Sequence, residues 1–430
     1  MPHAADRRSR RDHTPLRRRQ LPVLLDRLRQ PVREQSRGVR VTVDVLVIGA
    51  GAAGLGVARQ ADACGATTRV LECGERAGAS WWHRYDGLRL NTVRWLSDLP
   101  PQRMAAEHGR WPGRKAWARY LVDYAEQLPD VRYGVRADRV ERAGTRWRVR
   151  TSAGDMMAGN VVVASGHDRV PTTPAWPGRQ GYRGRVMHSA DFTSAQSLAG
   201  ARVLVVGTGN SGVEIATLAA HSDADEVAIS VRTPPLLLRR EIAGVPITVL
   251  AELGRLVPDR LLDWYGRRLH RWLWPDADRY GMGEPGRRLS EMRATYYSPP
   301  LDSGFTDAVR TGRIEIVGAL SGFDGDDVVL GDGDRREVDV VIAATGFHPG
   351  LEDLVGHLGV LDADGEPKAV AGEQDQRSPG LFFAGFRYGL FALLPYLEGD
   401  AEAIANAICR SRKPAAATLR RALKIGVLRP

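Results

Sequence analysis

The sequence has few cysteines and no long apolar run. Its three cysteines, Cys64, Cys73 and Cys409, are far apart and form no CxxC pair, which argues against a disulfide framework, a zinc site or a dithiol redox centre. No stretch approaches the roughly 18 consecutive apolar residues of a membrane-spanning helix. The 430 residues are 43% hydrophobic and 26% charged, so the composition is that of an ordinary soluble protein of two or three domains. A reducing cytoplasm is the simplest location.

Acidic residues are too few to balance the basic ones: 61 Lys and Arg face 51 Asp and Glu, which gives a net charge of +10. The excess is concentrated in residues 1–40, which contain twelve arginines and four acidic residues. A basic tail without apolar periodicity is more often disordered than a nucleic-acid-binding arm. Its longest apolar stretch, LPVLL, is too short for a signal peptide. We therefore expect a disordered tail or a misassigned translation start, and no nucleic-acid partner.

Residues 41–72 carry the pattern of a dinucleotide site. A strand rich in Val, Leu and Ile leads to Gly49-x-Gly51-x-x-Gly54, and an Ala-rich helix and a second strand ending on Glu72 follow. The first glycine permits the tight turn, the second lets a pyrophosphate approach the backbone, and the third lets the helix pack closely on the strand. The helix N-terminus then faces the phosphates, and the acid accepts hydrogen bonds from a ribose. A strand, loop, helix, strand and acid in register predict this site more strongly than the glycines alone.

The same unit recurs with Gly207-x-Gly209-x-x-Gly212 after the strand ARVLVV. Twenty residues after the last glycine stands Arg232, where an acid would favour the free 2′-hydroxyl of NAD. An arginine can pair with the 2′-phosphate of NADP, although Arg232 could also be a solvated residue at a strand end. An acid follows the first loop and an arginine follows the second, and this difference indicates two different dinucleotides. We assign FAD to the first loop and NADPH to the second.

Two near-copies, residues 160–171 and 339–350, bracket the second loop. Each consists of a buried strand, a small residue, Ser or Thr, Gly, an aromatic ring and Pro, as expected where the chain crosses between domains. This predicts an α/β fold of two Rossmann-like, three-layer dinucleotide-binding domains, with the NADPH domain inserted in the FAD domain. The expected parts are a tail at 1–40, FAD domain at 41–168, NADPH domain at 169–338 with a helical segment at 236–300, FAD domain at 339–415, and a C-terminal tail at 416–430.

Between the two units, YRGRVMHSADF (residues 182–192) resembles the FxGxxxHxxx(F/Y) signature of the flavin-containing monooxygenases, with Tyr in place of the first Phe. The stretch AATGF (343–347) looks like the ATG motif of the same group. PDADRYG (275–281) and GTGNSGVE (207–214) look most like the plant YUCCA-type branch. The resemblance extends from about residue 41 to residue 410.

The resemblance implies an NADPH-dependent FAD enzyme of EC 1.14.13 type, which inserts one oxygen atom of O₂ into a small organic substrate through a flavin C4a-(hydro)peroxide. The resemblance places a flavin-facing asparagine at Asn91, as the catalytic residue. Without the resemblance, an Asn-Thr pair would be interpreted as a turn or a helix cap. His188 is expected to be structural or to couple NADP binding to domain position, with a direct chemical role as the alternative. Trp81 could pack beside the flavin or fill the core.

The predicted site residues form one set. The cofactor-binding residues are Gly49, Gly51, Ala53, Gly54, Glu72, Trp81, Gly207, Gly209, Asn210, Ser211, Gly212, Arg232, His188, Thr345 and Gly346, and no metal is expected. The partners are a small-molecule substrate and O₂, with a homodimer as an option and without stable membrane insertion. The basic, aromatic helix predicted over 259–274 is expected to cover the NADPH domain or border the substrate channel, with contact with membrane lipids as the alternative.

Two other functions share part of this pattern. A flavin disulfide reductase has the two-loop architecture, but the sequence has no CxxC pair, and Phe386 stands where such enzymes have an acid near the flavin. A flavoprotein that binds nucleotides without catalysis is the second alternative.

Overall fold

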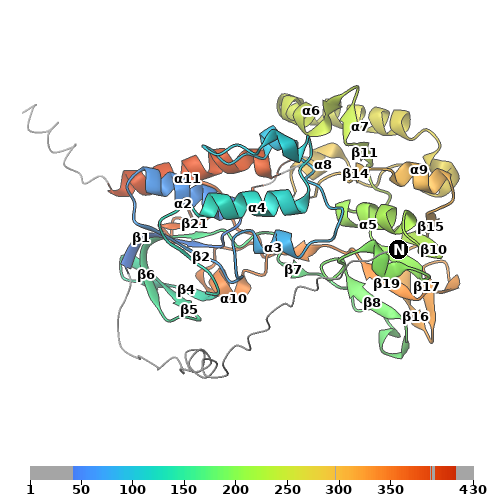
Figure 1. Cartoon of the computed structure of the whole chain (residues 1–430), viewed down its shortest axis with the longest axis horizontal. Helices are drawn as coiled ribbons and strands as arrows, with labels where there is room; N and C mark the ends of the chain where they lie inside the picture. Colours follow the sequence, from blue (N-terminus) through green and yellow to red (C-terminus); the bar gives the residue numbers. More distant parts are fainter. Residues whose placement is uncertain (1–41, 296, 388, 390–392, 413–430) are drawn as a thin grey trace, which may run out of the picture. The chain divides into compact units, whose positions relative to one another are not determined.

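The computed structural model describes residues 42–295, 297–387, 389 and 393–412. The described chain contains two largely parallel sheets, each covered by helices (Figure 1). The tails expected at 1–40 and 416–430 lie outside the described residues. No described helix combines the length and the apolar content that a bilayer crossing requires.

The first sheet has the strand order β3-β2-β1-β6-β5-β4, with β21 paired to β6. All its pairs are parallel except the hairpin β4–β5 and the pair β5–β6. Its strands are β1 (Thr42–Ile48), β2 (Thr68–Leu71), β3 (Val131–Arg132), β4 (Ala137–Ala143), β5 (Arg146–Thr151), β6 (Met156–Val163) and β21 (Leu381–Phe383).

Both faces of the first sheet are buried, which explains why its strands are apolar throughout. In β1, Val45 and Val47 face one apolar cluster, and Leu46 and Ile48 face another. The helices α2 (Ala52–Ala63), α4 (Arg114–Ala125) and α11 (Leu397–Arg412) cover the first face, and α10 (Glu352–Val355) and the hairpin β4–β5 contribute to the second. The short helix α3 (Ala79–Trp82) lies against α4.

The second sheet is parallel throughout, in the order β15-β10-β9-β19-β8. Its strands are β8 (Arg185–His188), β9 (Arg202–Val206), β10 (Glu226–Ser230), β15 (Glu315–Val317) and β19 (Val340–Ala343). The helices α5 (Asn210–Ala220) and α9 (Phe305–Arg310) pack on one face. The other face is covered by the small antiparallel sheet of β16 (Leu320–Asp324), β17 (Asp327–Leu330) and β18 (Arg335–Glu337).

The segment expected to be helical over 236–300 is helical in part. It contains α6 (Ile247–Leu253), α7 (Asp259–Leu273) and α8 (Leu289–Arg293) around a small apolar cluster of its own. It also contains the hairpin of β12 (Glu241–Ile242) and β13 (Val245–Pro246), and β11 (Leu238–Arg239) pairs with β14 (Leu301–Asp302). The 3₁₀ helices of the described chain are η1 (Arg94–Leu96), η2 (Ala106–His108), η3 (Arg179–Gly181), η4 (Ala195–Leu198), η5 (Gly254–Leu256), η6 (Ala277–Tyr280), η7 (Gly356–Leu358) and η8 (Leu394–Tyr396).

The two segments that connect the sheets pair with each other. β7 (Val170–Pro171), at the end of the first near-copy, is antiparallel to β20 (Phe347–His348), near the end of the second. All strands of the second sheet therefore lie in the sequence between β6 and β21 of the first sheet. The predicted α/β fold with two dinucleotide-binding units, one inserted in the other, is confirmed.

The predicted boundary at 339 is wrong. β19 pairs with β9 and β8 in the second sheet, so the chain returns to the first unit only after the β20 segment. The physical reason is that the two near-copies play equivalent parts. The strand in each near-copy belongs to the unit that the chain is about to leave. β6 closes the first unit before the crossing, and β19 closes the second.

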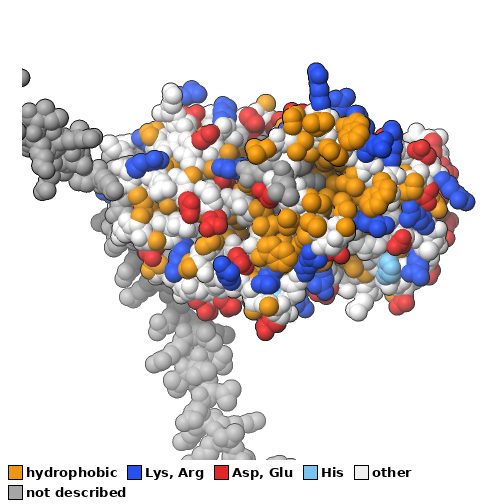
Figure 2. All heavy atoms as spheres, turned by 90° about the horizontal axis from the view of Figure 1, so that it is seen from above, with side chains coloured by type: hydrophobic (Ala, Val, Ile, Leu, Met, Phe, Trp, Pro, Cys, Tyr) orange, Lys and Arg blue, Asp and Glu red, His pale blue; other side chains and the backbone are white. Residues whose placement is uncertain are grey.

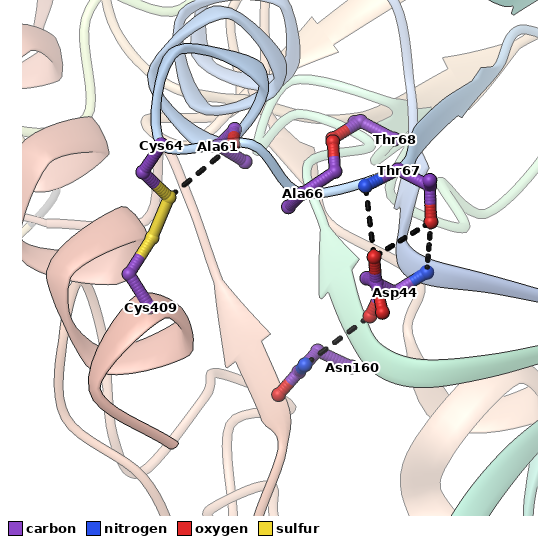
Figure 3. The surroundings of a disulfide bond; sticks show 8 residues. All are labelled: Asp44, Ala61, Cys64, Ala66, Thr67, Thr68, Asn160 and Cys409. Atoms are coloured by element: carbon purple, nitrogen blue, oxygen red, sulfur yellow. Dashed lines mark hydrogen bonds between the residues drawn. A yellow bond between two sulfur atoms is a disulfide. The ribbon is translucent and has the colours of Figure 1, made fainter. Parts of the chain in front are cut away.

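The argument against a disulfide framework did not anticipate a single disulfide bond. Cys64, at the C-terminal end of α2, is bonded to Cys409 in α11 (Figure 3). The two helices pack side by side on the first sheet, which brings together cysteines that are 345 residues apart. The cysteine argument for a reducing compartment therefore loses its basis, because disulfides are rare in the cytosol of mesophiles.

Candidate functional site

The first glycine loop has the geometry of a pyrophosphate cradle. A Cβ added at Gly49 would lie 2.4 Å from the carbonyl oxygen of Ala164, and one at Gly54 would lie 2.0 Å from the carbonyl oxygen of Gly49. At Gly51, the N-cap of α2, an added Cβ meets nothing within 4 Å, and no side chain caps the helix. The helix N-terminus therefore presents N–H groups that no described side chain caps, which suits a phosphate.

Glu72 lies at the edge of this loop. It follows β2, whose last residue Leu71 is in register with Ile48 at the end of β1. Its buried carboxylate accepts hydrogen bonds from the amide nitrogens of Ala50 at 2.9 Å and Gly74 at 2.8 Å. These bonds fix the carboxylate beside the loop, where the predicted contact with a ribose requires it.

The second loop repeats this geometry. A Cβ at Gly207 would lie 2.5 Å from the carbonyl oxygen of Ala344, and one at Gly212 would lie 2.0 Å from that of Gly207, whereas Gly209 has nothing within 4 Å. Each loop thus packs against the residue that follows β6 or β19, which is why the near-copies share small residues there. A second dinucleotide fits this cradle as well as the first.

The remaining residues of the two loops lie where the motif requires them. Ala53 is in the first turn of α2, and its methyl group packs against Gly385, which follows β21. Asn210 and Ser211 open α5 directly after Gly209. Arg232 is exposed two residues after the end of β10, on the same edge of the sheet as the loop. Its role as the 2′-phosphate partner remains a prediction.

The signature at 182–192 is built into the core of the second unit. The hydroxyl of buried Tyr182 donates to the carbonyl oxygen of Val338 at 2.5 Å. Gly184 is required because an added Cβ would lie 2.3 Å from the Tyr182 hydroxyl oxygen. Phe192 is buried, and its ring centroid lies 5.8 Å from that of Tyr85. The signature therefore joins the second sheet to the segment that follows the first loop.

His188, the last residue of β8, uses both ring nitrogens within the protein. Nδ1 accepts a hydrogen bond from the amide of Ala190 at 3.0 Å, so the neutral ring donates from Nε2 to the carbonyl oxygen of Gly346 at 3.1 Å. Burial lowers the pKa of His188, and the ring packs edge-on against Phe347. This arrangement favours the structural interpretation over proton transfer.

Thr345 and Gly346 lie at the crossing between the units. The Thr345 hydroxyl donates to the carbonyl oxygen of Thr172, and the Thr172 amide donates back to the carbonyl oxygen of Gly346. Trp81, in α3, packs edge-on against the ring of Trp117 in the core of the first unit. The core interpretation of Trp81 is therefore the one that its contacts favour.

Asn91 lies where the two units meet. Its Nδ2 donates to Oδ1 of Asn210 at 3.2 Å, and its own Oδ1 accepts from Nη2 of Arg240 at 3.4 Å. Asn210 Nδ2 in turn donates to the hydroxyl oxygen of Ser298 at 3.0 Å. A side chain predicted to face the flavin is thus in contact with the first residue of the helix that the second loop precedes.

Three residues that sequence reasoning did not assign complete this network. Glu214 accepts from the Tyr85 hydroxyl at 2.6 Å and forms an ion pair with Arg240 at 3.2 Å. Burial raises the pKa of Glu214, against the opposing effects of its bonds to Tyr85 and Arg240. The sequence contained one indication for Glu214: it is an acid in a helix that otherwise consists mainly of small and apolar residues, directly after the second loop. Tyr85 and Arg240 belong to no motif and carried no signal.

A family described as pyridine nucleotide-disulphide oxidoreductase matches residues 46–240, which include both glycine loops. Such an activity would need a reactive cysteine pair at the flavin. The Cys64–Cys409 disulfide instead lies at the far end of α2, about 18 Å along the helix axis from the first loop. The match therefore reflects the shared nucleotide-binding architecture.

Similarity to plant enzymes covers most of the chain. Indole-3-pyruvate monooxygenase YUCCA1 of Oryza sativa subsp. japonica is 30% identical over 349 residues, which make up 79% of this chain and 86% of that protein. Probable indole-3-pyruvate monooxygenase YUCCA9 of Arabidopsis thaliana is 28% identical over 362 residues, or 80% of this chain and 85% of that protein.

Solved structures share the fold. The flavin-containing monooxygenase from Stenotrophomonas maltophilia has a TM-score of 0.67 at 24% identity, over 86% of this chain and 99% of that chain. Cyclohexanone monooxygenase from Rhodococcus sp. Phi1, bound to NADP⁺, has a TM-score of 0.65 at 19% identity, over 87% and 85% of the two chains.

The fold and the two cradles define a flavoprotein oxidoreductase with two dinucleotide sites. At this level of similarity to the YUCCA-type enzymes, the chain belongs to the flavin-containing monooxygenase superfamily. It is an NADPH-dependent FAD monooxygenase that inserts one oxygen atom of O₂ into a small organic substrate. The family, the enzyme class and the cofactors predicted from the motifs are confirmed.

Proposed function

We propose that the first loop binds FAD, that the second binds NADPH, and that oxygenation takes place where Asn91 meets Asn210. The observation that carries this proposal is the hydrogen bond of 3.2 Å between these two amides. One belongs to the unit of the first loop, and the other opens the helix after the second loop. Two nucleotides bound in these cradles would extend toward this junction.

The residues then take distinct roles. Glu72 accepts hydrogen bonds from the ribose of FAD, and Arg232 pairs with the 2′-phosphate of NADPH. When bound, the flavin supplies the oxygen chemistry after its reduction by NADPH, and the protein supplies orientation and exclusion of water. Asn91 holds the reacting oxygen by an amide that both donates and accepts without titrating.

For the substrate we propose a 2-oxo acid that carries an aromatic group. The relatives from rice and Arabidopsis are named for indole-3-pyruvate. Beside Asn91 the chain offers a cation and a ring: the guanidinium of Arg240 lies 5.9 Å from the ring centroid of Trp111. The Nε of Arg240 is buried and finds no protein acceptor among the described residues, so it can donate to a substrate carboxylate.

The compartment and partners follow from the cofactors and the charge. NADPH is regenerated inside cells, which supports a cytoplasmic site of action. In that compartment, thiol reductants would act on the Cys64–Cys409 disulfide. Most of the net positive charge belongs to residues 1–40, which supports the absence of a nucleic-acid partner.

A substrate panel tests the proposal. Indole-3-pyruvate, phenylpyruvate, cyclohexanone, thioanisole and a tertiary amine are each supplied with NADPH and ¹⁸O₂, and NADPH consumption, H₂O₂ release and labelled product are measured. We expect the two oxo acids to suppress H₂O₂ release and to yield product with one labelled oxygen. Coupled turnover of only the ketone, sulfide or amine would overturn the substrate class and leave the cofactor assignment intact. Arg240→Lys should raise KM for the oxo acids more than for the ketone.

A further inference from the structure

The outward face of α7 carries large apolar side chains in contact with solvent. Leu261 is 51% exposed, Trp264 48%, Tyr265 59% and Trp272 68%. Leu256, just before the helix, is 95% exposed. We call these five residues the α7 face. Figure 2 views the molecule from the side on which α6 and α7 lie, and hydrophobic side chains gather there beside those of Lys and Arg.

The fold does not need these side chains. The opposite face of α7 is buried through Leu262, Gly266, His270 and Leu273, which recur at helical spacing. The contact is close, because a Cβ at Gly266 would lie 2.7 Å from the side chain of Leu289. α7 is therefore held by its inner face, which leaves the α7 face free to contact something else.

Arginines accompany the apolar side chains. Arg260, Arg267, Arg268 and Arg271 are all exposed on α7. At 3.6 residues per turn, three of them fall within about 40° of one another around the helix, beside a stripe of Leu261, Tyr265 and Trp272 of about the same width. Trp264 and Arg268 lie between the two stripes, with the guanidinium 5.4 Å from the ring centroid.

Charge distinguishes the candidate occupants of this face. Arg271 is paired with Glu284 at 2.7 Å. A second copy of the chain, packed face to face, would still bring Arg260, Arg267 and Arg268 against the same three arginines. Residues 1–40 have twelve arginines and four acids, so their charge is also of the wrong sign. An anionic bilayer surface offers negative headgroups for the arginines and an apolar boundary for the rings, and Trp and Tyr prefer that boundary.

We propose that the α7 face docks the enzyme on the surface of an anionic lipid bilayer. The helix lies along the surface with Leu261, Trp264, Tyr265 and Trp272 at headgroup level, and the arginines contact lipid phosphates. Docking is peripheral and reversible, and it is independent of the proposed substrate. Each arginine near such a surface contributes about fivefold to the partition coefficient, and added salt weakens this contribution.

Vesicle sedimentation of the full-length holoenzyme tests the proposal. We expect binding to vesicles of phosphatidylcholine mixed with phosphatidylglycerol, weakening with salt, and at least tenfold less binding to phosphatidylcholine alone. Trp264→Ser/Trp272→Ser should abolish most binding, and Arg267→Gln/Arg268→Gln should weaken it about 25-fold. Brominated lipid should quench tryptophan fluorescence of the parent more than that of the double tryptophan variant.

Matched controls separate this face from other exposed residues. Tyr133, 40% exposed, and Arg146, also exposed, lie in the first unit, so Tyr133→Ser and Arg146→Gln should bind as the parent does. FAD content and NADPH oxidation should be unchanged in the α7 variants and in Arg146→Gln, because the altered side chains are solvent-exposed. Unchanged vesicle binding in the double tryptophan variant would overturn the proposal and assign binding to another basic segment. Absence of binding would overturn it too, and a dimer that this variant dissociates would assign the face to a second copy.

Discussion

The hydroxyl of Tyr85 donates a hydrogen bond of 2.6 Å to Oε2 of Glu214. It connects the segment that follows the first glycine loop to the helix that follows the second. Burial and the nearby Glu214 carboxylate raise the pKa of Tyr85 well above its usual value, so the tyrosine stays a donor at any working pH. On the other carboxylate oxygen, Arg240 supplies the opposite charge. Tyr85 thus contacts one member of a compensated, largely buried ion pair that lies within the second unit.

Glu214→Leu should destabilise the protein by about 3–5 kcal/mol, because it leaves the Arg240 charge without its partner in a buried position. Thermal unfolding followed by circular dichroism measures the loss. Tyr85→Phe should cost less, about 1.5–3 kcal/mol, because it removes a single donor to a charged acceptor. The control is Glu214→Leu/Arg240→Met, which removes both charges and should recover much of the stability. A further loss in the double variant would contradict the role of the ion pair.

Gly51→Glu should fold and be colourless. An added side chain at Gly51 meets no protein atom within 4 Å, but it would occupy the place of the pyrophosphate. The ratio of flavin absorbance to protein absorbance measures FAD content. Gly209→Glu is the matched variant of the second loop, and it should keep FAD but lose reduction by NADPH. A full complement of FAD in Gly51→Glu would show that the first loop does not hold this cofactor.

Arg232→Ala should raise KM for NADPH by roughly ten- to a hundredfold, because a charge-assisted bond to the 2′-phosphate is lost. KM for NADH should stay nearly unchanged. Steady-state oxidation of both nucleotides measures the two values. Arg313→Ala is the control, since this exposed arginine precedes β15 and lies at the amino end of the parallel sheet, away from the loop. Equal losses with NADPH and NADH would mean that Arg232 is structural.

The two cradles could be predicted from the sequence because their requirements are local. Gly49 and Gly207 adopt positive φ angles of 111° and 110°, which favour glycine, and Gly54 and Gly212 leave no room for a Cβ. Each constraint lies within a few residues of the motif. The alternation of buried strands and helices then determined the fold class without knowledge of long-range contacts.

The features that sequence reasoning missed depend on packing between distant segments. The Cys64–Cys409 disulfide exists because α2 and α11 are neighbours on the first sheet. The unit to which β19 belongs is decided by its pairing with β9 and β8. The network around Asn91 joins positions more than a hundred residues apart, such as Tyr85 and Glu214, and spacing gives no information about such contacts.

The stability of the protein should fall as pH rises from 6.5 to 9, because of His167. Burial opposes protonation of His167, but its hydrogen bonds to Asp168 and Glu366 outweigh it and raise the pKa to about 9 from 6.5. In this window the folded state holds a proton that the unfolded state releases. The stabilisation, up to about 3 kcal/mol, is complete below pH 6.5 and is lost as pH rises through 9.

Glu366→Gln should flatten this dependence, since it removes the negative charge 2.8 Å from His167 Nε2, and a neutral amide oxygen favours the protonated ring less. Melting temperatures measured across the same pH window provide the test. Glu373→Gln, a change at an exposed glutamate in the same region, is the control and should keep the slope of the parent protein. An equal slope in Glu366→Gln and the parent would mean that another group carries the pH dependence.

Asn91→Ala should uncouple NADPH oxidation from product formation without removing the flavin. The side-chain amide of Asn91 donates a hydrogen bond to Asn210 and accepts one from Arg240. These two hydrogen bonds hold the side chain at the junction and involve no residue of the first loop. FAD binding and reduction by NADPH should therefore stay near the parent values. A lost hydrogen bond to the reacting oxygen costs up to about 3 kcal/mol by analogy with an oxyanion donor. This corresponds to about a hundredfold shift from product toward H₂O₂.

The measurement for Asn91→Ala is the ratio of H₂O₂ released to NADPH consumed, with the rate of anaerobic flavin reduction measured separately by stopped-flow absorbance. Asn160→Ala is the matched control, because Asn160 donates to the carbonyl oxygen of Asp44 at 3.2 Å (Figure 3), away from both loops. Only Asn91→Ala should raise the ratio. An unchanged ratio would return Asn91 to the role of a turn residue. A variant that loses its flavin would contradict the prediction as well, because it would place Asn91 among the residues that hold FAD or maintain the fold.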